Sequence, residues 1–234
     1  QPMKYLDRYV IVYNGEIYNY LELKSELSAL GYCFKSNSDT EVILAAYAAW
    51  GDQCVNRFNG MWAFAIYDQQ KNIIFCSRDR FGVKPFYYTS QNDLFAFGSE
   101  IKQLLDFQSS RSANKKVVID FIVYSLSEHT NETFFEGIYS LQGGHNLIFD
   151  LKDDSFQIFR WYSIDHKSSL SNLSDVEALE FYKSKFFSSV NLRLRSDVPV
   201  GTCLSGGMDS SSVAAVAAGQ YNDLSSGRFK GIHA

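Results

Sequence analysis

The sequence predicts a mixed α and β fold in two parts, an α+β part followed by the beginning of an α/β part. Over residues 1–162, short apolar segments pair across polar turns and alternate with helical patterns. Over 174–234, a long helix precedes a strand, a glycine-rich loop, a helix and a strand, an order typical of a parallel α/β sheet. A stretch rich in Ser, Asp and Lys separates the parts, and we expect 163–173 to be a linker.

Two helices are expected near the start of the first part. Segment 20–30 repeats leucine at a helical spacing, and a glycine follows it as a stop signal. The leucines on this face are Leu23, Leu27 and Leu30. A second helix is expected from Ser38 to Trp50. Ser38 and Glu41 have the spacing of a capping box, in which each side chain bonds the backbone N–H of the other.

The strands of the first part are expected to pair as hairpins. A strand over 9–13 precedes them, and a helix over 117–124 interrupts the series. The charged segment 78–85 is expected to be a salt-bridged structural turn rather than a substrate contact. The expected hairpins are 61–67 with 73–77, 86–89 with 94–97, and 146–151 with 156–162.

The second part begins with another capping-box spacing, Ser174 with Glu177, which predicts a helix through about Leu194. Alternating elements of the parallel α/β type are expected after it. They are strand 198–203, helix 211–219 and strand 229–234.

The most specific motif of the chain is the loop that joins the strand at 198–203 to the next helix. Glycines let a backbone approach a ligand closely, and loop amides together with a helix N-terminus suit a phosphate. No Gly-Lys-Ser/Thr follows, so the loop is not a Walker A motif. The alternative is an ordinary glycine-rich turn, but the strand–loop–helix context favours phosphate. The candidate residues are Leu204, Ser205, Gly206, Gly207, Asp209, Ser210 and Ser211.

Composition excludes some classes of function. The net charge of −4 argues against a nucleic-acid-binding surface, and no apolar run approaches the roughly 20 residues that span a bilayer. The cysteines lack paired metal-type spacing, so we expect free buried thiols in a cytoplasmic protein rather than disulfides. These residues are Cys33, Cys54, Cys76 and Cys203.

Further motifs occur in a fixed order along nearly the whole chain. They are VIVYNGEIYN at 10–19, SDTEVIL at 38–44, FNGMWAFA at 58–65, RDRFGVKPFYY at 78–88, GSEIK at 98–102, SDVPVG at 196–201 and LSGGMDSS at 204–211. Together they resemble glutamine-hydrolysing asparagine synthetases. The resemblance implies that 1–162 has the αββα fold of an N-terminal-nucleophile amidohydrolase. It implies that 174–234 begins an ATP-pyrophosphatase domain of the PP-loop type.

The resemblance implies a glutaminase site in the first part. Asn14 and Gly15 correspond to the oxyanion donors, a side-chain amide and a backbone N–H. Asn14, Glu16 and Asp39 correspond to glutamine-binding residues, with the two carboxylates on the α-ammonium group. The residues alone leave alternatives open. Asn14-Gly15 is also a frequent hairpin turn, and Asp39 is also suited to capping a helix that begins at Thr40.

The resemblance also implies ATP and Mg²⁺ at the phosphate loop. The serines and glycines of that loop correspond to the pyrophosphate-binding residues, and Leu204 corresponds to a residue that lines the adenosine. Asp209 corresponds to the residue that holds Mg²⁺ through the pyrophosphate. The alternative for Asp209 is an acid of the first helical turn, stabilised by the helix dipole.

The implied reaction uses two sites. Glutamine is hydrolysed to glutamate and ammonia, ATP activates aspartate as β-aspartyl-AMP, and ammonia displaces AMP to give asparagine. The expected partners are glutamine, aspartate and ATP, and the resemblance is compatible with a homodimer. Two alternatives are kept. One is a relative that amidates another carboxylate, such as a β-lactam synthetase-like or polysaccharide-amidating enzyme. The other is a catalytically silent glutamine-binding module.

The family places its catalytic cysteine before the position of Gln1 and continues its synthetase domain beyond Ala234. We therefore expect the chain to be an internal fragment that hydrolyses no glutamine by itself. Cys33, Cys54 and Cys76 are not expected to replace the nucleophile, because none is N-terminal. We also expect the second part to be less stable than the first and to bind ATP weakly, because a parallel sheet needs its faces covered.

Overall fold

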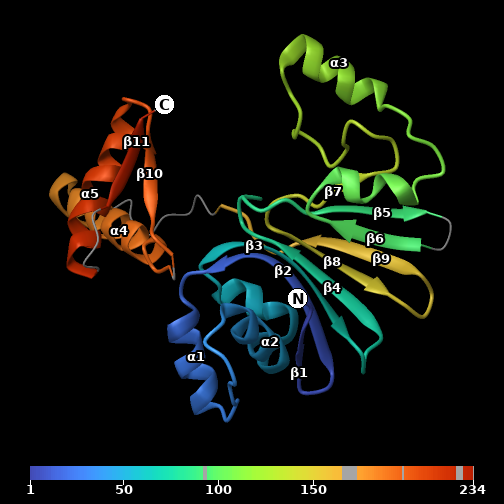
Figure 1. The fold of residues 1–234 in the computed structure, drawn as a ribbon, viewed down its shortest axis with the longest axis horizontal. Helices are drawn as coiled ribbons and strands as arrows, with labels where there is room; N and C mark the ends of the chain where they lie inside the picture. Colours follow the sequence, from blue (N-terminus) through green and yellow to red (C-terminus); the bar gives the residue numbers. More distant parts are fainter. Residues whose placement is uncertain (92–93, 165–172, 197, 225–228, 234) are drawn as a thin grey trace. The chain divides into compact units, whose positions relative to one another are not determined.

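The computed structural model describes residues 1–91, 94–164, 173–196, 198–224 and 229–233, and they form two compact units (Figure 1). Unit 1 comprises residues 1–164 and unit 2 comprises residues 165–234. Most of the predicted linker, 163–173, lies outside the described residues.

Unit 1 contains an antiparallel six-stranded sheet and a smaller three-stranded sheet. All three predicted hairpins are confirmed. The three-residue strand β1 was not predicted, and β2 runs four residues further than predicted. In spatial order, the larger sheet is β1 (Met3–Tyr5), β2 (Tyr9–Ile17), β3 (Gly60–Asp68), β4 (Ile73–Arg78), β8 (His145–Asp150) and β9 (Ser155–Arg160). The smaller sheet is β6 (Leu94–Gly98), β5 (Tyr87–Gln91) and β7 (Tyr139–Ser140).

The layers of unit 1 follow from the alternation of side chains along its strands. Helices α1 (Tyr20–Ala29) and α2 (Asp39–Trp50) cover one face of the larger sheet, over a core that includes Ile11, Phe64 and Phe75 (Figure 1). A second apolar cluster joins the larger sheet to the smaller one, and it includes Ala63, Ala65, Cys76, Phe86, Tyr88 and Leu147. The predicted α+β class is confirmed, with a helical layer and two sheets in the expected order.

The ends of α1 and α2 differ in detail from prediction. Leu23 and Leu27 are buried, but Leu30 is 57% exposed, because the helix ends one residue before it. Ser38 is the N-cap of α2 as predicted, and its hydroxyl accepts a hydrogen bond from the backbone of the second helical residue.

The predicted capping box at Ser38 is wrong. The Glu41 carboxylate turns instead to the loop before the helix. It accepts hydrogen bonds from the backbone N–H groups of Lys35 and Ser36 and from the Ser36 hydroxyl. Glu41 is buried, and a buried carboxylate is stable only when several donors surround it. The preceding loop supplies more donors than the N-cap offers.

Segment 78–85 is a structural turn, but its charges bond the backbone rather than each other. Arg78 donates to the carbonyls of Gly82, Lys84 and Leu141. The Asp79 carboxylate accepts from four backbone N–H groups, those of Trp62, Phe81, Val83 and Lys84. The turn therefore joins β4 to β3 and to the smaller sheet.

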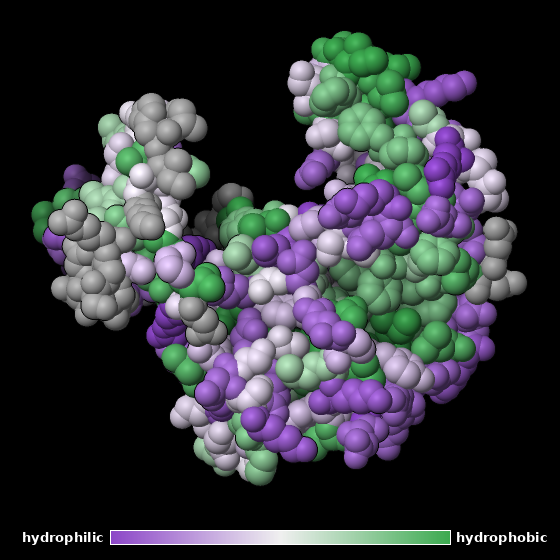
Figure 2. Space-filling model, in the orientation of Figure 1, coloured by the Kyte–Doolittle hydropathy of each residue, from purple (hydrophilic) through white to green (hydrophobic). Residues whose placement is uncertain are grey.

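After β6, the chain forms the short 3-10 helices η2 (Ile101–Gln103) and η3 (Leu105–Phe107) and then the helix α3 (Lys115–Tyr124), while η1 (Gly51–Arg57) follows α2. The predicted helix at 117–124 is confirmed. Only Val117 of α3 is buried, and Figure 2 shows apolar side chains gathered at the surface of this helix.

Unit 2 contains the elements α4 (Asp175–Arg193), β10 (Gly201–Leu204), α5 (Met208–Leu224) and β11 (Lys230–His233). The capping box of Ser174 and Glu177 is confirmed, as is the parallel pairing of β10 with β11. Helix α5 begins three residues earlier than predicted. Among the described residues of this unit, the buried apolar ones are Val190, Leu194 and Ala217. Within the described residues, we find no helix with the length and apolar character needed to cross a membrane.

Candidate functional site

The candidate glutaminase residues lie at an open edge of the larger sheet. Because β1 pairs only with the first three residues of β2, no other strand among the described residues pairs along the rest of that edge. The Gln1 carboxamide bonds both backbone groups of Tyr13, at 2.9 Å from Tyr13 N and 2.5 Å from Tyr13 O. Further along, Ile17 N donates to Asp39 Oδ2 at 2.9 Å. Backbone N–H groups two residues apart point to the same side of a strand. The Gly15 N–H therefore points to this open edge, between Gln1 and Asp39.

The pairing of β2 with β3, on the other edge of β2, agrees with this direction of the Gly15 N–H. Gly15 lies opposite Trp62 in the register of β2 and β3. Trp62 N donates to Asp79 Oδ2 at 3.2 Å, and Trp62 O accepts from Asp79 N at 2.9 Å. Neither backbone group of Trp62 therefore bonds Gly15. A Cβ at position 15 would lie 2.2 Å from Met61 O, which explains the glycine. The alternative of an Asn-Gly hairpin turn is wrong, because Asn14 and Gly15 lie inside β2.

The Asn14 side chain lies at the other part of the site, a cavity of about 260 Å³ between the two sheets. Its amide Nδ2 donates to Ser99 Oγ at 3.3 Å. Ala65, Phe86 and Phe97 contribute apolar lining to the cavity. The polar lining comes from Gln1, Tyr13, Asn14, Ser99 and Gln103. The structure thus places the Asn14 amide in this cavity and directs the neighbouring Gly15 N–H to the open edge of the same strand.

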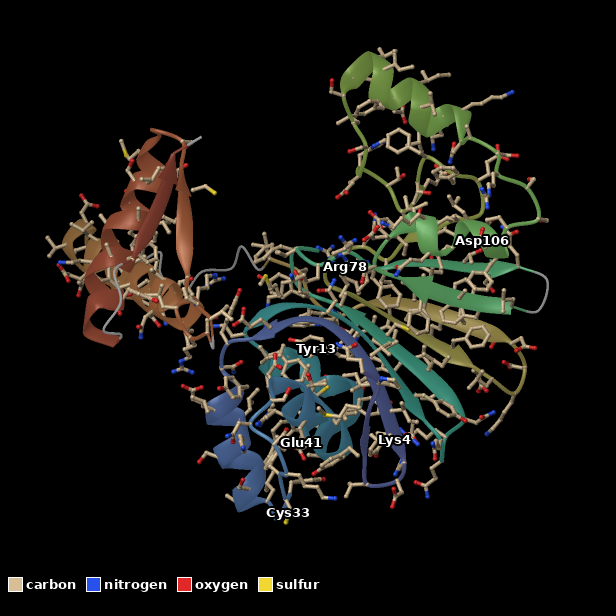
Figure 3. The ribbon with its side chains drawn as sticks, viewed as in Figure 1. Lys4, Tyr13, Cys33, Glu41, Arg78 and Asp106 are labelled. Carbon is tan, nitrogen blue, oxygen red and sulfur yellow. The ribbon has the colours of Figure 1, made fainter. Side chains whose placement is uncertain are left out.

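Asp39 faces β2 rather than its own helix. Its Oδ2 accepts hydrogen bonds from the Tyr13 hydroxyl at 2.8 Å and from Ile17 N at 2.9 Å, and Figure 3 shows Tyr13 where β2 passes α2. Ser38, not Asp39, is the N-cap. Burial, followed by the negative charges of Asp39 and Glu16, raises the pKa of Tyr13 above its ordinary value. The hydroxyl therefore stays protonated as a donor, and both candidate carboxylates lie near enough to influence it.

Sequence reasoning missed three residues of this site: Gln1, Tyr13 and Ser99. Ser99 belongs to the motif at 98–102, which supported the resemblance without suggesting a role. Tyr13 precedes Asn14, and alternation along a strand places neighbouring side chains on opposite faces. That alternation was a usable signal: it predicts that Tyr13 faces the helices when Asn14 faces the second sheet.

In unit 2, the candidate phosphate loop joins β10 to α5 in the predicted strand–loop–helix order. Gly206 has a φ of +79°, in the left-handed region that favours glycine, and α5 begins at Met208. The Ser210 hydroxyl ties the loop together: it accepts from Ser205 N at 3.3 Å and lies 3.2 Å from Gly207 O. The oxygen atoms of the Ser205 and Ser210 hydroxyls are 3.1 Å apart.

The loop is open at Gly206. A Cβ at Gly206 would meet nothing within 4 Å, so the space in front of it is open. Leu204 is half-buried, while Asp209 and Ser211 are exposed. Among the described residues, no group of three or more His, Cys, Asp or Glu could hold a metal ion. An Mg²⁺ ion at Asp209 would therefore take further ligands from a bound phosphate or from water.

The four cysteines are free, as predicted, but only two are buried. Cys54 and Cys76 lie in the core of unit 1, and burial raises the pKa of both thiols. Cys33 and Cys203 are exposed, so the expectation of buried thiols is wrong for them. Cys33 lies just after α1, in the loop before α2.

Comparison with known families shows to which family the chain belongs. The family model described as a glutamine amidotransferase domain matches residues 1–162. The chain belongs to the glutamine amidotransferase domain family. A second model, described as asparagine synthase, matches residues 182–233 of this amidotransferase chain. The two matches, in this order, confirm the resemblance to glutamine-hydrolysing asparagine synthetases that the motifs indicated.

Curated relatives agree. The amidotransferase chain is 40% identical to asparagine synthetase [glutamine-hydrolyzing] 3 of Bacillus subtilis, over 92% of this chain and 34% of that protein. It is 42% identical to putative asparagine synthetase [glutamine-hydrolyzing] 2 of Methanocaldococcus jannaschii, over 92% of this chain and 41% of that protein. It is also 34% identical to amidase chry2 of Gibberella zeae, over 87% of this chain and 30% of that protein. The chain thus spans between 30% and 41% of the length of these relatives.

Proposed function

We propose that this chain is part of a glutamine-hydrolysing asparagine synthetase. In this proposal, 1–162 form the glutaminase domain, 163–173 form the linker and 174–234 begin the ATP-pyrophosphatase domain. The observation that supports it best is β2 itself: the Asn14 amide lies in a cavity, the Gly15 N–H points to the open edge of the strand, and the Asp39 carboxylate is held at Ile17.

The geometry suits glutamine hydrolysis. Attack on the side-chain carbonyl of glutamine turns its oxygen into an oxyanion, which the Gly15 N–H and Asn14 Nδ2 stabilise. One such donor typically contributes about 10²–10³ in rate. Glu16 and Asp39 bind the α-ammonium of glutamine, which distinguishes the amino acid from a simple amide. Neither Cys54 nor Cys76 serves as nucleophile, because both are buried with raised thiol pKa values.

Unit 2 contributes the phosphate-binding half of the synthetase site. Residues 205–211 hold the pyrophosphate of ATP through loop amides and hydroxyls, Leu204 lines the adenosine, and Asp209 holds Mg²⁺ through the pyrophosphate. Bound ATP would supply the adenylyl group that activates the β-carboxylate of aspartate. The protein acts in the cytoplasm, where glutamine, aspartate and ATP are available.

Titration calorimetry with L-glutamine tests the glutaminase half of this proposal. We expect Asp39→Asn to weaken glutamine binding at least about tenfold, because a charge-assisted hydrogen bond is lost. Asp106→Asn is the matched control, since Asp106 forms an exposed ion pair with Arg111, and it should bind like the unmodified chain. Equal affinity of Asp39→Asn and the control would contradict the proposed pocket.

A further inference from the structure

We propose that Tyr13 is a positioning residue for the recognition of the α-ammonium group of glutamine, acting by fixing the Asp39 carboxylate through its hydroxyl. This inference rests on the proposed function, because it assumes that Asp39 receives that ammonium group. It adds a role that the motif containing Asn14, Gly15 and Glu16 does not suggest.

Two donors converge on one oxygen of Asp39. The Tyr13 hydroxyl and Ile17 N lie 2.8 and 2.9 Å from Oδ2. Within the described part of the chain, no hydrogen bond reaches Oδ1. The carboxylate torsion of aspartate is broad and roughly two-fold when nothing holds it. Two donors on Oδ2 select one orientation and leave Oδ1 to accept from a cation.

Tyr13 itself is held rigidly. Its backbone N–H and carbonyl are both bonded to the Gln1 carboxamide, and its side chain is buried. Its ring packs over Gly15: a Cβ at position 15 would lie 2.9 Å from Tyr13 Cε2. The hydroxyl is therefore fixed relative to both the Gly15 N–H and Asp39.

Alternation along β2 directs the Tyr13 ring to the helix side and the Asn14 amide to the cavity between the sheets. Tyr13 therefore acts on the carboxylate that would hold the α-ammonium and not on the group that would hold the reacting amide. Its loss should affect only ligands that carry an α-ammonium.

The test compares two ligands by titration calorimetry of the 234-residue chain. L-glutamine carries the α-ammonium, and glutaramate is the same molecule without the amino group. Tyr13→Phe should weaken glutamine binding about tenfold, the lower end of what one hydrogen bond to a charged group contributes. It should leave glutaramate binding unchanged. Tyr47→Phe is the control, because Tyr47 is also a buried tyrosine but is not among the hydrogen-bond partners of Asp39 in the described structure.

The outcomes separate this inference from the proposed function. If Asp39→Asn loses selectivity for glutamine but Tyr13→Phe does not, the role of Tyr13 is overturned and the pocket stands. Equal weakening of both ligands by Tyr13→Phe would show a merely structural residue. If the unmodified chain binds glutamine no better than glutaramate, the ammonium pocket fails, and the inference with it.

A measurement on the unmodified chain covers the case in which Tyr13→Phe does not fold. With tyrosine labelled with ¹³C at Cζ, the signal of Tyr13 should shift when glutamine binds and remain unchanged with glutaramate. An unchanged Tyr13 signal at saturating glutamine would overturn the proposal.

Discussion

Gly15 lies opposite Trp62 in the register of β2 and β3, and the two residues exchange no backbone hydrogen bond because Trp62 bonds Asp79 instead. The Gly15 N–H points to the open edge of the sheet, as do the N–H groups of Tyr13 and Ile17. Asp79 belongs to the turn 78–85, so this turn bonds the β3 residue that lies opposite a candidate oxyanion donor.

Replacing Gly15 by alanine should be strongly destabilising. The added Cβ would lie 2.2 Å from Met61 O and 2.7 Å from Trp62 Cα, and backbone atoms of a central strand cannot move away easily. We expect a loss of about 3 kcal/mol in the free energy of unfolding. Gly31→Ala is the control: its φ of +92° is unfavourable for alanine, but the space is open, so the loss should be about 1 kcal/mol. Urea denaturation measures both losses in the free energy of unfolding. Equal losses for Gly15→Ala and Gly31→Ala would contradict the close contact at Gly15.

The ion pair of Arg8 with Asp68 should stabilise unit 1 above acidic pH. Arg8 Nε and Nη2 each donate at 2.8 Å to the Asp68 carboxylate, whose side chain is 1% exposed. Burial opposes ionisation of Asp68, but the hydrogen bonds from Arg8 and from backbone N–H groups outweigh it and lower the pKa of Asp68. We expect Asp68→Asn to cost about 2–3 kcal/mol at neutral pH, since it leaves Arg8 without its charge partner.

The pH dependence of this loss has a definite sign. A lowered pKa in the folded state means that the contribution of Asp68 is fully present above the unfolded pKa of about 3.9 and declines as pH falls through the folded pKa. The difference in stability between the unmodified chain and Asp68→Asn should therefore shrink below about pH 4. The exposed pair of Asp106 with Arg111 is the control, and Asp106→Asn should cost less than about 0.5 kcal/mol. A difference that is constant with pH would argue against a role of Asp68 ionisation.

The cysteines should divide into two reactive and two protected thiols. Cys33 and Cys203 are exposed, whereas Cys54 and Cys76 are buried with raised thiol pKa values. A thiol reagent at neutral pH should modify the first two in the native protein and the other two only after unfolding. Mass spectrometry identifies the sites, and rapid native labelling of Cys76 would contradict the core described for unit 1.

Unit 2 should unfold before unit 1. Its buried apolar residues are few, and α4 exposes large apolar side chains such as Val176, Leu179 and Tyr182. Apolar burial is the main stabilising term, so amide hydrogens of 175–221 should exchange faster than those of β2, β3 and β4. Hydrogen exchange followed by mass spectrometry measures this directly. Equal protection in the two units would refute the prediction.

The sequence predicted the hairpins and helices well because their signals are local. Alternation, turn residues and end signals predicted β3 with β4, α2 and α4 within a few residues. What it missed depends on which of several nearby partners a residue bonds. Glu41 has the spacing of a capping box, yet the loop at Lys35 and Ser36, five and six residues before it, provides more donors. The strand β1 is three residues long and is defined by pairing with β2.

Only part of the site was predicted, because some of its residues are identified by local motifs and others only by their contacts. Motif residues such as Asn14 and Gly15 were identified from the resemblance, and their placement at an edge of β2 required the sheet register. Tyr13 and Ser99 act through contacts that join positions 26 and 85 residues apart, to Asp39 and Asn14 respectively. Neither contact can be read from spacing along the chain.

The central claim is that glutamine binds at the open edge of β2. The most direct measurement is an amide NMR titration of the ¹⁵N-labelled chain with L-glutamine. We expect saturable shifts at Gly15, Ile17, Asp39 and Ser99, with little change in β9 or α3. Shifts confined to other parts of the protein, or no saturable shift at all, would contradict it.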